Sequence, residues 1–356
     1  MTLPSELIRP EIAALSAYHV PPSNGLIKLD AMENPYTWPQ AMREKWQDRV
    51  ANIALNRYPD PHANALKESL RNTFAIPQSQ SLLLGNGSDE IIQLLAMALA
   101  KPGAKVLAPE PGFVMYRMIA TFTGMQYVGV PLNGDDFSLD MPAMREAIGK
   151  HDPALIFIAY PNNPTANLFD DADIDEIISL ANGLVVIDEA YFPFAERSYL
   201  AGLEAHPNLL VMRTVSKMGL AGLRLGYLIG DQQWLHEFEK VRMPYNINVM
   251  TQAAAEFALA HADEFDRQAA EIRDERTRVG LALAEFEHLQ VFPSAANFIL
   301  VRVNRGAQVV FDHLLANGIL IKNLATAGGA LDQCLRITVG TPEENDALLS
   351  ALASAV

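Results

Sequence analysis

After Arg213, two further cations interrupt a small and apolar stretch of the chain, RTVSKMGLAGLRLGYLIG at 213–230. Lys217 and, seven positions later, Arg224 stand among residues of the kind that folded proteins bury. Burying a charge costs free energy unless an anion or an electrophile meets it. A surface lysine on a turn and a salt-bridged arginine would explain the pair without any chemistry. Taken alone that plain explanation is favoured, so the choice depends on the rest of the chain.

A glycine-rich turn, GNGSD, separates the apolar run at 81–85 from an amphipathic stretch with helical spacing at 89–100. In this turn Gly87, Ser88 and Asp89 would offer backbone N–H groups at the positive end of a helix, which together form an anion site. The alternative is an ordinary turn capped by Ser88 or Asp89. The turn does not have the GxGxxG spacing of dinucleotide-binding proteins.

Polar side chains also follow two further apolar runs. Asn163 lies in YPNNPT, where an Asn-Pro turn is the plain explanation. Asp188 ends the run LVVID, and Tyr191 follows three residues later. A carboxylate there needs a cationic or proton-bearing partner, which a structural salt bridge, a magnesium site or a nucleotide site would also provide. Because ligands bind at the carboxyl ends of strands in doubly wound sheets, we expect these residues to meet.

Together these residues suit a flat heteroaromatic ring that carries a phosphate, an aldehyde and a ring nitrogen. Lys217 supplies the amine for a Schiff base with the aldehyde. Asp188 keeps the ring nitrogen protonated, because a nearby opposite charge shifts a pKa by about 1–3 units. The ring oxygen and the phosphate have their own candidate partners: Asn163, Tyr191, the 87–89 turn and Arg224. The ligand with these groups is pyridoxal phosphate.

Composition limits the function classes. The chain has 356 residues, of which 50% are apolar and 19% charged, as in a globular protein with room for two domains. Its net charge of −15 argues against nucleic acid or an anionic membrane as a partner. The single cysteine allows no internal disulfide, and we see neither a signal peptide nor a membrane span. We therefore expect a cytoplasmic location.

Short apolar runs alternate with amphipathic stretches through most of the chain. They predict strands at 81–85, 104–110, 154–160, 184–190 and 208–214, with helical patterns such as 89–100 and 170–182 between them. This alternation predicts an α/β fold whose large domain has three layers, with a mostly parallel sheet between two layers of helices. We expect the large domain to span 30–246.

After residue 246 the pattern changes. A long helical region at 250–286 precedes apolar runs at 298–303, 318–322 and 335–340. The sequence TPEE at 341–344 predicts the start of a last helix that runs to about Ser354. We expect a smaller α+β domain at 247–356, completed by the N-terminal arm at 1–29.

The motifs GNGSDE, YPNNPT, DEAY, SK with GLRLG, and LRITVG follow one another across nearly the whole chain. In this order they resemble those of the fold-type I pyridoxal-phosphate aminotransferases. The stretches LDAMENPY (29–36), NRYPD (56–60) and LRITVGTPEEN (335–345) are similar to the histidinol-phosphate aminotransferase subfamily. The resemblance implies a homodimer that exchanges an amino group between L-histidinol phosphate and 2-oxoglutarate in histidine biosynthesis. The mechanism it implies is ping-pong through a Schiff base at Lys217, with imidazole acetol phosphate and L-glutamate as products.

By this resemblance Lys217, Asp188 and Tyr191 are the catalytic residues. Lys217 would bind the cofactor and then move the proton between Cα and C4′, while Asp188 pairs with the ring nitrogen and Tyr191 contacts the 3′ oxygen. The implied cofactor-binding set is Gly87, Ser88, Asp89, Phe113 (stacked on the ring), Asn163, Asp188, Tyr191, Thr214, Ser216, Lys217, Arg224 and, from a neighbouring subunit, Tyr58.

For the substrate, Arg336 resembles the arginine that binds the anionic end, which its bidentate geometry suits. The other candidates are Lys322, Tyr18, Asn34, Tyr245 and Asn297. Two positions depart from the family: Ala166 stands where a glycine is usual, and Lys322 stands where a second arginine is expected. The eight histidines show no metal-binding spacing, so we expect no metal.

Three other functions stay open at this point. An aromatic amino acid aminotransferase and a threonine-phosphate decarboxylase would share the cofactor residues, because the bond broken at Cα depends on how the substrate is oriented. A non-catalytic regulator that binds the same cofactor would carry a basic DNA-binding segment, which this acidic chain does not show.

Overall fold

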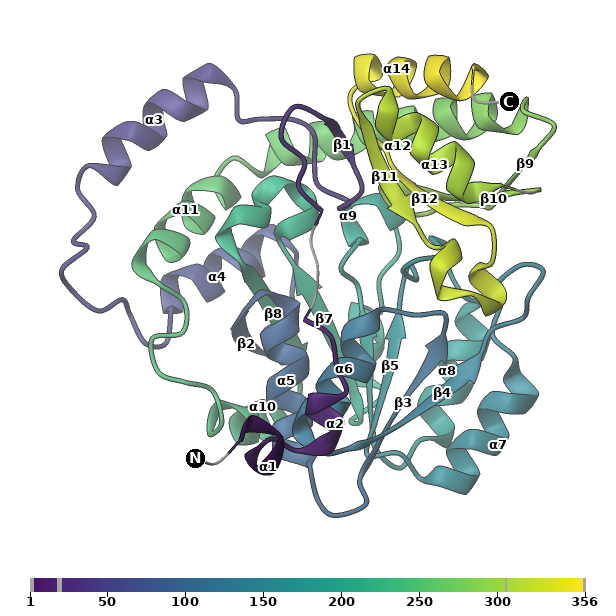
Figure 1. The fold of residues 1–356 in the computed structure, drawn as a ribbon. Helices are drawn as coiled ribbons and strands as arrows, with labels where there is room; N and C mark the ends of the chain where they lie inside the picture. The colour runs from purple at the N-terminus through teal and green to yellow at the C-terminus, as the bar shows by residue number, and fades with distance from the viewer. Residues whose placement is uncertain (1–2, 18–20, 305, 355–356) are drawn as a thin grey trace.

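The computed structural model describes residues 3–17, 21–304 and 306–354. This part of the chain forms a seven-stranded sheet in the order β2-β8-β7-β6-β5-β3-β4 and a five-stranded sheet in the order β1-β11-β12-β10-β9. In Figure 1 the smaller sheet and its helices lie above the larger one, at the upper right.

The large sheet is parallel apart from β8, which is antiparallel to both of its neighbours. Its strands are β2 (Ser81–Asn86), β3 (Lys105–Glu110), β4 (Gln126–Pro131), β5 (Leu155–Ala159), β6 (Leu184–Asp188), β7 (Leu209–Thr214) and β8 (Leu225–Gly230). β2, β3, β5, β6 and β7 are close to the predicted runs, whereas β4 and β8 were not among them. The mostly parallel sheet is confirmed. Continuous apolar strands suit this arrangement because helices cover both faces.

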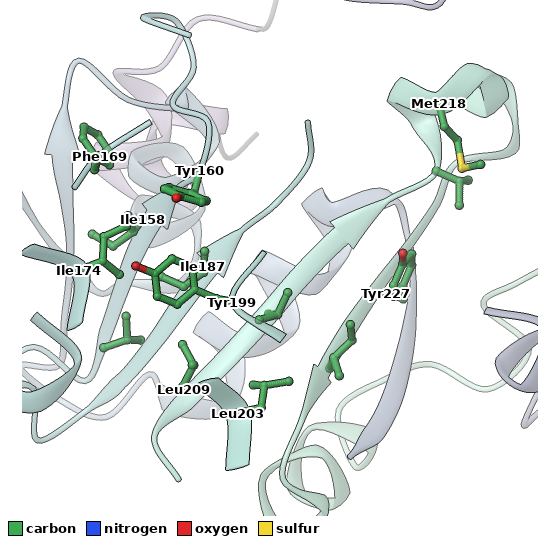
Figure 2. Packing of buried hydrophobic residues seen from close by; sticks show 14 of the residues in the cluster. Ile158, Tyr160, Phe169, Ile174, Ile187, Tyr199, Leu203, Leu209, Met218 and Tyr227 are labelled. Carbon is green, nitrogen blue, oxygen red and sulfur yellow. The ribbon is translucent and has the colours of Figure 1, made fainter. Parts of the chain in front are cut away.

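Helices form the two outer layers. Those of the large domain are α3 (Gln40–Val50), α4 (Asn64–Thr73), α5 (Gly87–Leu99), α6 (Val114–Thr123), α7 (Met141–His151), α8 (Asp171–Leu180), α9 (Phe192–Ala195), α10 (Gln232–Glu239) and α11 (Val249–Leu259), with short turns η1 (Leu200–Glu204), η2 (Ser216–Leu220) and η3 (Ala221–Leu223). Successive side chains of β6 point to opposite faces, so Val186 packs in one buried cluster and Ile187 in the other. Figure 2 shows part of the second cluster, where Ile158 and Ile187 of neighbouring strands lie near Ile174 of α8. The three-layer prediction is confirmed.

The small sheet combines one strand from the N-terminal part of the chain with four strands from its C-terminal part. Its strands are β1 (Ile27–Leu29), β9 (Leu289–Val291), β10 (Phe298–Val303), β11 (Ile319–Asn323) and β12 (Cys334–Thr338), and its helices are α12 (Ala262–Ala284), α13 (Ala307–Ala316) and α14 (Pro342–Ala353), with turns η4 (Ala325–Ala327) and η5 (Gly329–Leu331). β1 pairs parallel with β11, although the two are far apart in the sequence. α14 starts in the predicted capping box, in which Thr341 and Glu344 bond each other's backbone N–H groups.

The helical region expected at 250–286 is two helices, α11 and α12, separated at Ala260 and His261. Phe257 of α11 packs in the core of the large sheet, whereas Ile272 of α12 packs in the core of the small sheet. A single straight helix could not place side chains in both cores, and this is the physical reason for the break between α11 and α12.

The N-terminal arm contacts both parts of the fold. The arm contains the helices α1 (Pro4–Leu7) and α2 (Pro10–Ala13). α2 lies beside α6, where Arg9 Nη2 donates a 2.6 Å hydrogen bond to the carbonyl of Phe122, whereas β1 joins the small sheet. The domain limits expected from the sequence stay a prediction. In the described part of the chain no helix is both long and apolar enough to cross a membrane, and the cytoplasmic location also stays a prediction.

Candidate active site

The carboxyl ends of β5, β6 and β7 open onto a cavity of about 380 Å³. These three strands are neighbours in the sheet, so the loops that follow them meet at one edge. The predicted residues that line the cavity are Ser88, Asp89, Phe113, Asn163, Asp188, Tyr191, Thr214, Ser216, Lys217 and Arg224. Residues from four separate motifs are thereby brought to one place.

Asp188 ends β6 and is buried. Its Oδ2 accepts a 2.6 Å hydrogen bond from the Tyr116 hydroxyl, and its Oδ1 accepts the N–H of Ala190 at 3.1 Å. Burial raises the pKa of Asp188 to about 6, although the hydrogen bond from Tyr116 acts in the opposite direction. Neither partner is a cation, so the carboxylate is suited to a proton-bearing nitrogen of a ligand in the cavity.

Lys217 lies in the turn η2, directly after β7. Its Nζ donates to the carbonyl of Ala31 at 3.2 Å and lies 5.7 Å from the ring centre of Tyr191. Removal from water, and after it the positive charge of Arg336, lower the pKa of Lys217 to about 8. A lysine with such a pKa is neutral much more often than a surface lysine, as a nucleophilic amine must be.

The start of α5 is suited to an anion. The helix begins at Gly87, whose φ is +78°, and Arg224 reaches over it to bond Asp89 Oδ2 at 3.2 Å. A Cβ at Gly87 would lie 2.6 Å from Arg224 Nη2. A Cβ at Gly226 of β8 would lie 2.6 Å from the nitrogen of Ser88, so this glycine lets the strand approach the start of the helix. A helix N-terminus beside a guanidinium is a phosphate-binding arrangement.

Two hydroxyl groups join this anion site from the end of β7. Ser216 Oγ and Thr214 Oγ1 lie 2.8 Å apart, and Thr214 also receives the backbone N–H of Ser216 at 3.2 Å. Both side chains line the cavity. The Thr214 hydroxyl donates to the carbonyl of Leu225 at 3.0 Å, so Ser216 and Arg224 are the donors left for the oxygens of a phosphate.

On the opposite side, Asn163 and Tyr191 form a polar pair. Asn163 Nδ2 donates to the Tyr191 hydroxyl at 3.1 Å, while its Oδ1 accepts Arg336 Nη1 at 2.6 Å. Burial raises the pKa of Tyr191, so its hydroxyl stays protonated. Arg336 comes from β12 of the small sheet and also donates to the carbonyl of Asp30 at 2.8 Å. The predicted anion-binding arginine therefore lies beside the predicted partners of the ring oxygen.

Two predicted tyrosines lie away from this cavity. Tyr58 and Tyr245 stack on each other with their ring centres 4.5 Å apart, and their side chains are 80% and 41% exposed. Tyr58 belongs to the segment between α3 and α4, which stands out from the body at the left of Figure 1. Within the described residues of one chain neither tyrosine belongs to the cavity wall, and their functional roles stay predictions.

None of the remaining described substrate candidates, Asn34, Asn297 and Lys322, lines the cavity. Asn34 Nδ2 donates to the carbonyl of Met218 at 3.1 Å and to Gln268 Oε1 at 2.9 Å. Asn297 Nδ2 donates to the carbonyl of Met32 at 3.0 Å. Lys322 is directly opposite Arg336 in the antiparallel pair of β11 and β12, and Tyr18 lies outside the described residues. Their contact with a substrate stays a prediction.

Ala166, where the family usually has a glycine, keeps the backbone of a glycine. Its φ is +66° and its side chain is fully buried. Its N–H donates to the carbonyl of Asn162 at 2.8 Å, and its own carbonyl accepts the N–H of Ala295 at 2.8 Å. These two bonds hold a left-handed alanine at a cost of about 1–2 kcal/mol, and the Cβ is accommodated in the core of the small domain.

The sequence did not single out Tyr116 or the wall formed by Ala31, Met32 and Glu33. A signal for Tyr116 was present, because it follows Phe113 by three residues at the start of a helix, and residues at that spacing share one face. The wall segment lies inside the motif LDAMENPY, of which only Asn34 was considered.

The site fits pyridoxal phosphate on three independent grounds. Asp188 is a buried carboxylate facing the cavity without a cationic partner among the described residues, the start of α5 forms an anion site, and Lys217 is an amine with a lowered pKa. In the described part of the chain no three His, Cys, Asp or Glu side chains are close enough together to hold a metal ion.

Comparison with known proteins agrees with this geometry. Residues 24–352 match the family described as aminotransferase class I and II. The chain is 54% identical to histidinol-phosphate aminotransferase 2 of Cupriavidus pinatubonensis over 100% of this chain and 98% of that protein. It is 54% identical to histidinol-phosphate aminotransferase of Chromobacterium violaceum, over 98% of this chain and 97% of that protein.

A solved structure shows the same fold. The structure of histidinol-phosphate aminotransferase from Sinorhizobium meliloti in complex with pyridoxal-5'-phosphate superimposes with a TM-score of 0.86 at 26% identity, covering 98% of this chain and 97% of that one. Three findings lead to one assignment: the family match, the 54% identity to two named relatives and the shared fold. The chain belongs to the class I and II aminotransferases and, among them, to the histidinol-phosphate aminotransferases.

Proposed function

We propose that this protein transfers an amino group between L-histidinol phosphate and 2-oxoglutarate, giving imidazole acetol phosphate and L-glutamate, with pyridoxal phosphate as its cofactor. One observation carries the proposal: a buried carboxylate, an amine of lowered pKa and a helix N-terminus with an arginine converge on a single cavity. The relatives named histidinol-phosphate aminotransferase supply the substrate.

The cofactor would be held at its two ends. The N–H groups that begin α5, Arg224 and the hydroxyl of Ser216 would bind the phosphate, and Thr214 would assist by holding Ser216 in place. At the other end, the Asp188 carboxylate would accept a hydrogen bond from the protonated ring nitrogen. Asn163 and Tyr191 would hydrogen-bond the ring oxygen, and Phe113 would pack on the face of the ring.

When bound, pyridoxal phosphate supplies an electron sink for the negative charge that forms at the substrate Cα when its proton leaves. Lys217 meets the aldehyde as a neutral amine, which its lowered pKa favours. The Lys217 amine would also take the proton from Cα and return it at C4′. Asp188 would keep the ring nitrogen protonated and so maintain the positive charge that draws electrons from Cα.

Both amino donors and both acceptors are anions, and in a ping-pong reaction they occupy the same cavity in turn. Arg336 would bind the carboxylate of glutamate or 2-oxoglutarate and then the phosphate of histidinol phosphate, because a guanidinium suits both groups. Its contact with Asn163 puts it close to the ring oxygen end of the site.

The proposal includes a homodimer in which Tyr58 reaches the phosphate of the neighbouring subunit's cofactor. It is supported by the 80% exposure of Tyr58 and by the outstretched segment that carries it. Two measurements test the homodimer: the molar mass of the protein in solution, and the cofactor affinity of Tyr58→Phe compared with the wild type. A monomer that binds the cofactor with unchanged affinity after the substitution would contradict it.

The substrate assignment is tested by comparing three amino compounds at one enzyme concentration. With 2-oxoglutarate as acceptor, we expect glutamate to form with L-histidinol phosphate at a much higher kcat/KM than with L-phenylalanine. With L-threonine phosphate we expect no carbon dioxide release. Preference for phenylalanine would indicate an aromatic amino acid aminotransferase, and carbon dioxide release would indicate a decarboxylase.

A further inference from the structure

Tyr116 on α6 touches Asp188 directly but belongs to none of the predicted sets. Its hydroxyl donates to Asp188 Oδ2 at 2.6 Å, and its side chain is only 2% exposed. Asp188 lines the cavity, whereas Tyr116 is a buried residue of α6 outside the cavity wall. The tyrosine is therefore a direct hydrogen-bond partner of the carboxylate that does not itself line the cavity.

Aromatic packing holds the ring of Tyr116 on two sides. It stacks on Phe157 of β5 with ring centres 4.5 Å apart and planes 3° from parallel. The ring of Phe113 meets it edge to face at 5.5 Å and 86°. Phe157 is fully buried and Phe113 lines the cavity. The hydroxyl is thus fixed in direction, and the same ring supports the phenylalanine that is expected to pack on the cofactor.

The two hydrogen bonds to Asp188 fix the plane of its carboxylate. Tyr116 bonds Oδ2 and the N–H of Ala190 bonds Oδ1, so rotation about the Cβ–Cγ bond would break both. Each oxygen still has a lone pair for a further donor. The carboxylates of Asp89 and Glu189 act against ionisation of Asp188, and the phenol donor acts in favour of it.

We propose that Tyr116 is a positioning residue for the amino-transfer reaction: its hydroxyl holds the Asp188 carboxylate in place to accept a hydrogen bond from the protonated ring nitrogen of the cofactor, and its ring supports Phe113. The inference rests on the proposed function and deepens it at the ring-nitrogen end of the site. Its hydroxyl acts only through Asp188, so its effect depends on the ring nitrogen.

The test compares cofactor-free wild type with Tyr116→Phe, which removes one oxygen and keeps the ring in its stack. Two ligands are titrated and followed by absorbance: pyridoxal phosphate, and its 1-deaza analogue, in which carbon replaces the ring nitrogen. We expect the substitution to weaken pyridoxal phosphate about tenfold, as for a lost hydrogen bond to a charged group, and to change the affinity for the analogue by less than about twofold. In turnover with saturating cofactor we expect kcat to fall about tenfold with KM nearly unchanged.

Tyr160→Phe is the matched control. It removes a hydrogen bond of the same length, from the Tyr160 hydroxyl to Asp171 Oδ1 at 2.6 Å, at a place outside the cavity wall described here. We expect it to leave both affinities and kcat at the wild-type values. Thermal unfolding of the three proteins shows whether each is folded.

A second test combines Tyr116→Phe with Asp188→Asn, so the role of Tyr116 is not judged from the Tyr116→Phe variant alone. In that background we expect Tyr116→Phe to have no more than about a twofold further effect on pyridoxal phosphate affinity, because the partner charge is already gone. An equal loss of affinity for both ligands, an unchanged affinity for pyridoxal phosphate, or full additivity with Asp188→Asn would overturn the role of Tyr116. Failure of the wild type to bind pyridoxal phosphate would overturn the proposed function instead.

Discussion

The guanidinium of Arg336 donates a 2.6 Å hydrogen bond from Nη1 to Oδ1 of Asn163 and thereby joins the small sheet to the loop after β5 of the large sheet. Because the guanidinium donates to the amide oxygen and so fixes the amide, Nδ2 of Asn163 faces the hydroxyl of Tyr191. The second guanidinium nitrogen donates to the carbonyl of Asp30. The residue proposed to bind the substrate anion therefore also orients the residues at the ring oxygen.

Arg336→Ala should raise KM for both L-histidinol phosphate and 2-oxoglutarate by about 100-fold, because each substrate loses a charge-assisted bidentate contact. Arg336→Lys should recover only part of this, since lysine keeps the charge but not the fork. Arg302→Ala is the control, because it removes a small-sheet arginine that bonds the carbonyl of Ala330. Steady-state kinetics with unchanged KM in Arg336→Ala would show that the anion site is elsewhere.

Lys217→Ala should lower kcat by at least about 1,000-fold, because the variant loses both the nucleophile and the proton carrier. Borohydride reduction followed by peptide mass analysis should label Lys217 with the cofactor in the wild type and no lysine in the variant. Retained turnover, or a label at another lysine, is the result that this account does not allow.

The lowered pKa of Lys217 predicts how cofactor capture depends on pH. The neutral amine reacts with the aldehyde, so the rate of capture by the cofactor-free protein should rise with pH and level off above about 8. In Arg336→Ala the levelling should move to higher pH, because the positive charge of Arg336 contributes to lowering the pKa. Stopped-flow absorbance across pH 6–10 measures both. A rate that still rises steeply at pH 10 in the wild type would contradict the lowered pKa.

Asp188→Asn should stabilise the cofactor-free protein at neutral pH while it lowers activity. The pKa of Asp188 is raised by folding to about 6, so the folded state binds more protons between about pH 4 and 6 and stability falls as the pH rises through that window. Above it the buried charge costs up to about 3 kcal/mol. The variant should therefore unfold at a higher Tm than the wild type at pH 7.5, with the difference shrinking at pH 4.5.

Asp171→Asn is the control for that comparison, since Asp171 also accepts a tyrosine hydroxyl at 2.6 Å but is exposed to water. We expect no gain in Tm from it. Calorimetry that finds Asp188→Asn less stable than the wild type at pH 7.5 would show that the buried charge is compensated in the cofactor-free fold.

Gly87→Ala should weaken cofactor binding about tenfold or more, because its Cβ would lie 2.6 Å from Arg224 Nη2 and displace the guanidinium. Gly103→Ala is a matched control: its φ of +80° is nearly that of Gly87, but a Cβ there meets no atom within 4 Å. Both variants should lose about 1–2 kcal/mol of stability from the left-handed backbone. Equal cofactor affinities of the two variants would show that Arg224 does not bind the cofactor phosphate.

Most of the cavity follows from the sequence because the residue types at strand ends are unusual. A carboxylate after an apolar run and an amide in a proline-rich loop have few structural uses, and parallel neighbouring strands bring such residues to one edge. Asp188 and Asn163 were therefore predictable as neighbours, and the structure places both in the cavity wall. The glycine-rich turn was predictable for a similar reason, since it directly precedes a helix.

The partners of amide and hydroxyl groups were much less predictable. Asn34 and Asn297 were expected near the substrate, yet in the structure they bond the backbone carbonyls of Met218 and Met32. Which carbonyl remains free for a side chain depends on the packing of two domains, and local sequence does not contain that information. The contact between Tyr116 and Asp188 depends in the same way on how α6 is rotated about its axis. The break between α11 and α12 occurs without glycine or proline, so helical periodicity alone did not reveal it.

The central claim is tested most directly by the visible spectrum of the purified protein loaded with pyridoxal phosphate. L-Histidinol phosphate is added first, and 2-oxoglutarate is added after the spectrum has settled. We predict that the yellow absorbance disappears with the first addition and returns with the second, since the amino group is taken up and then passed on. A yellow protein whose spectrum does not respond to L-histidinol phosphate would contradict the proposed substrate, and a protein that never becomes yellow would contradict the role of Lys217.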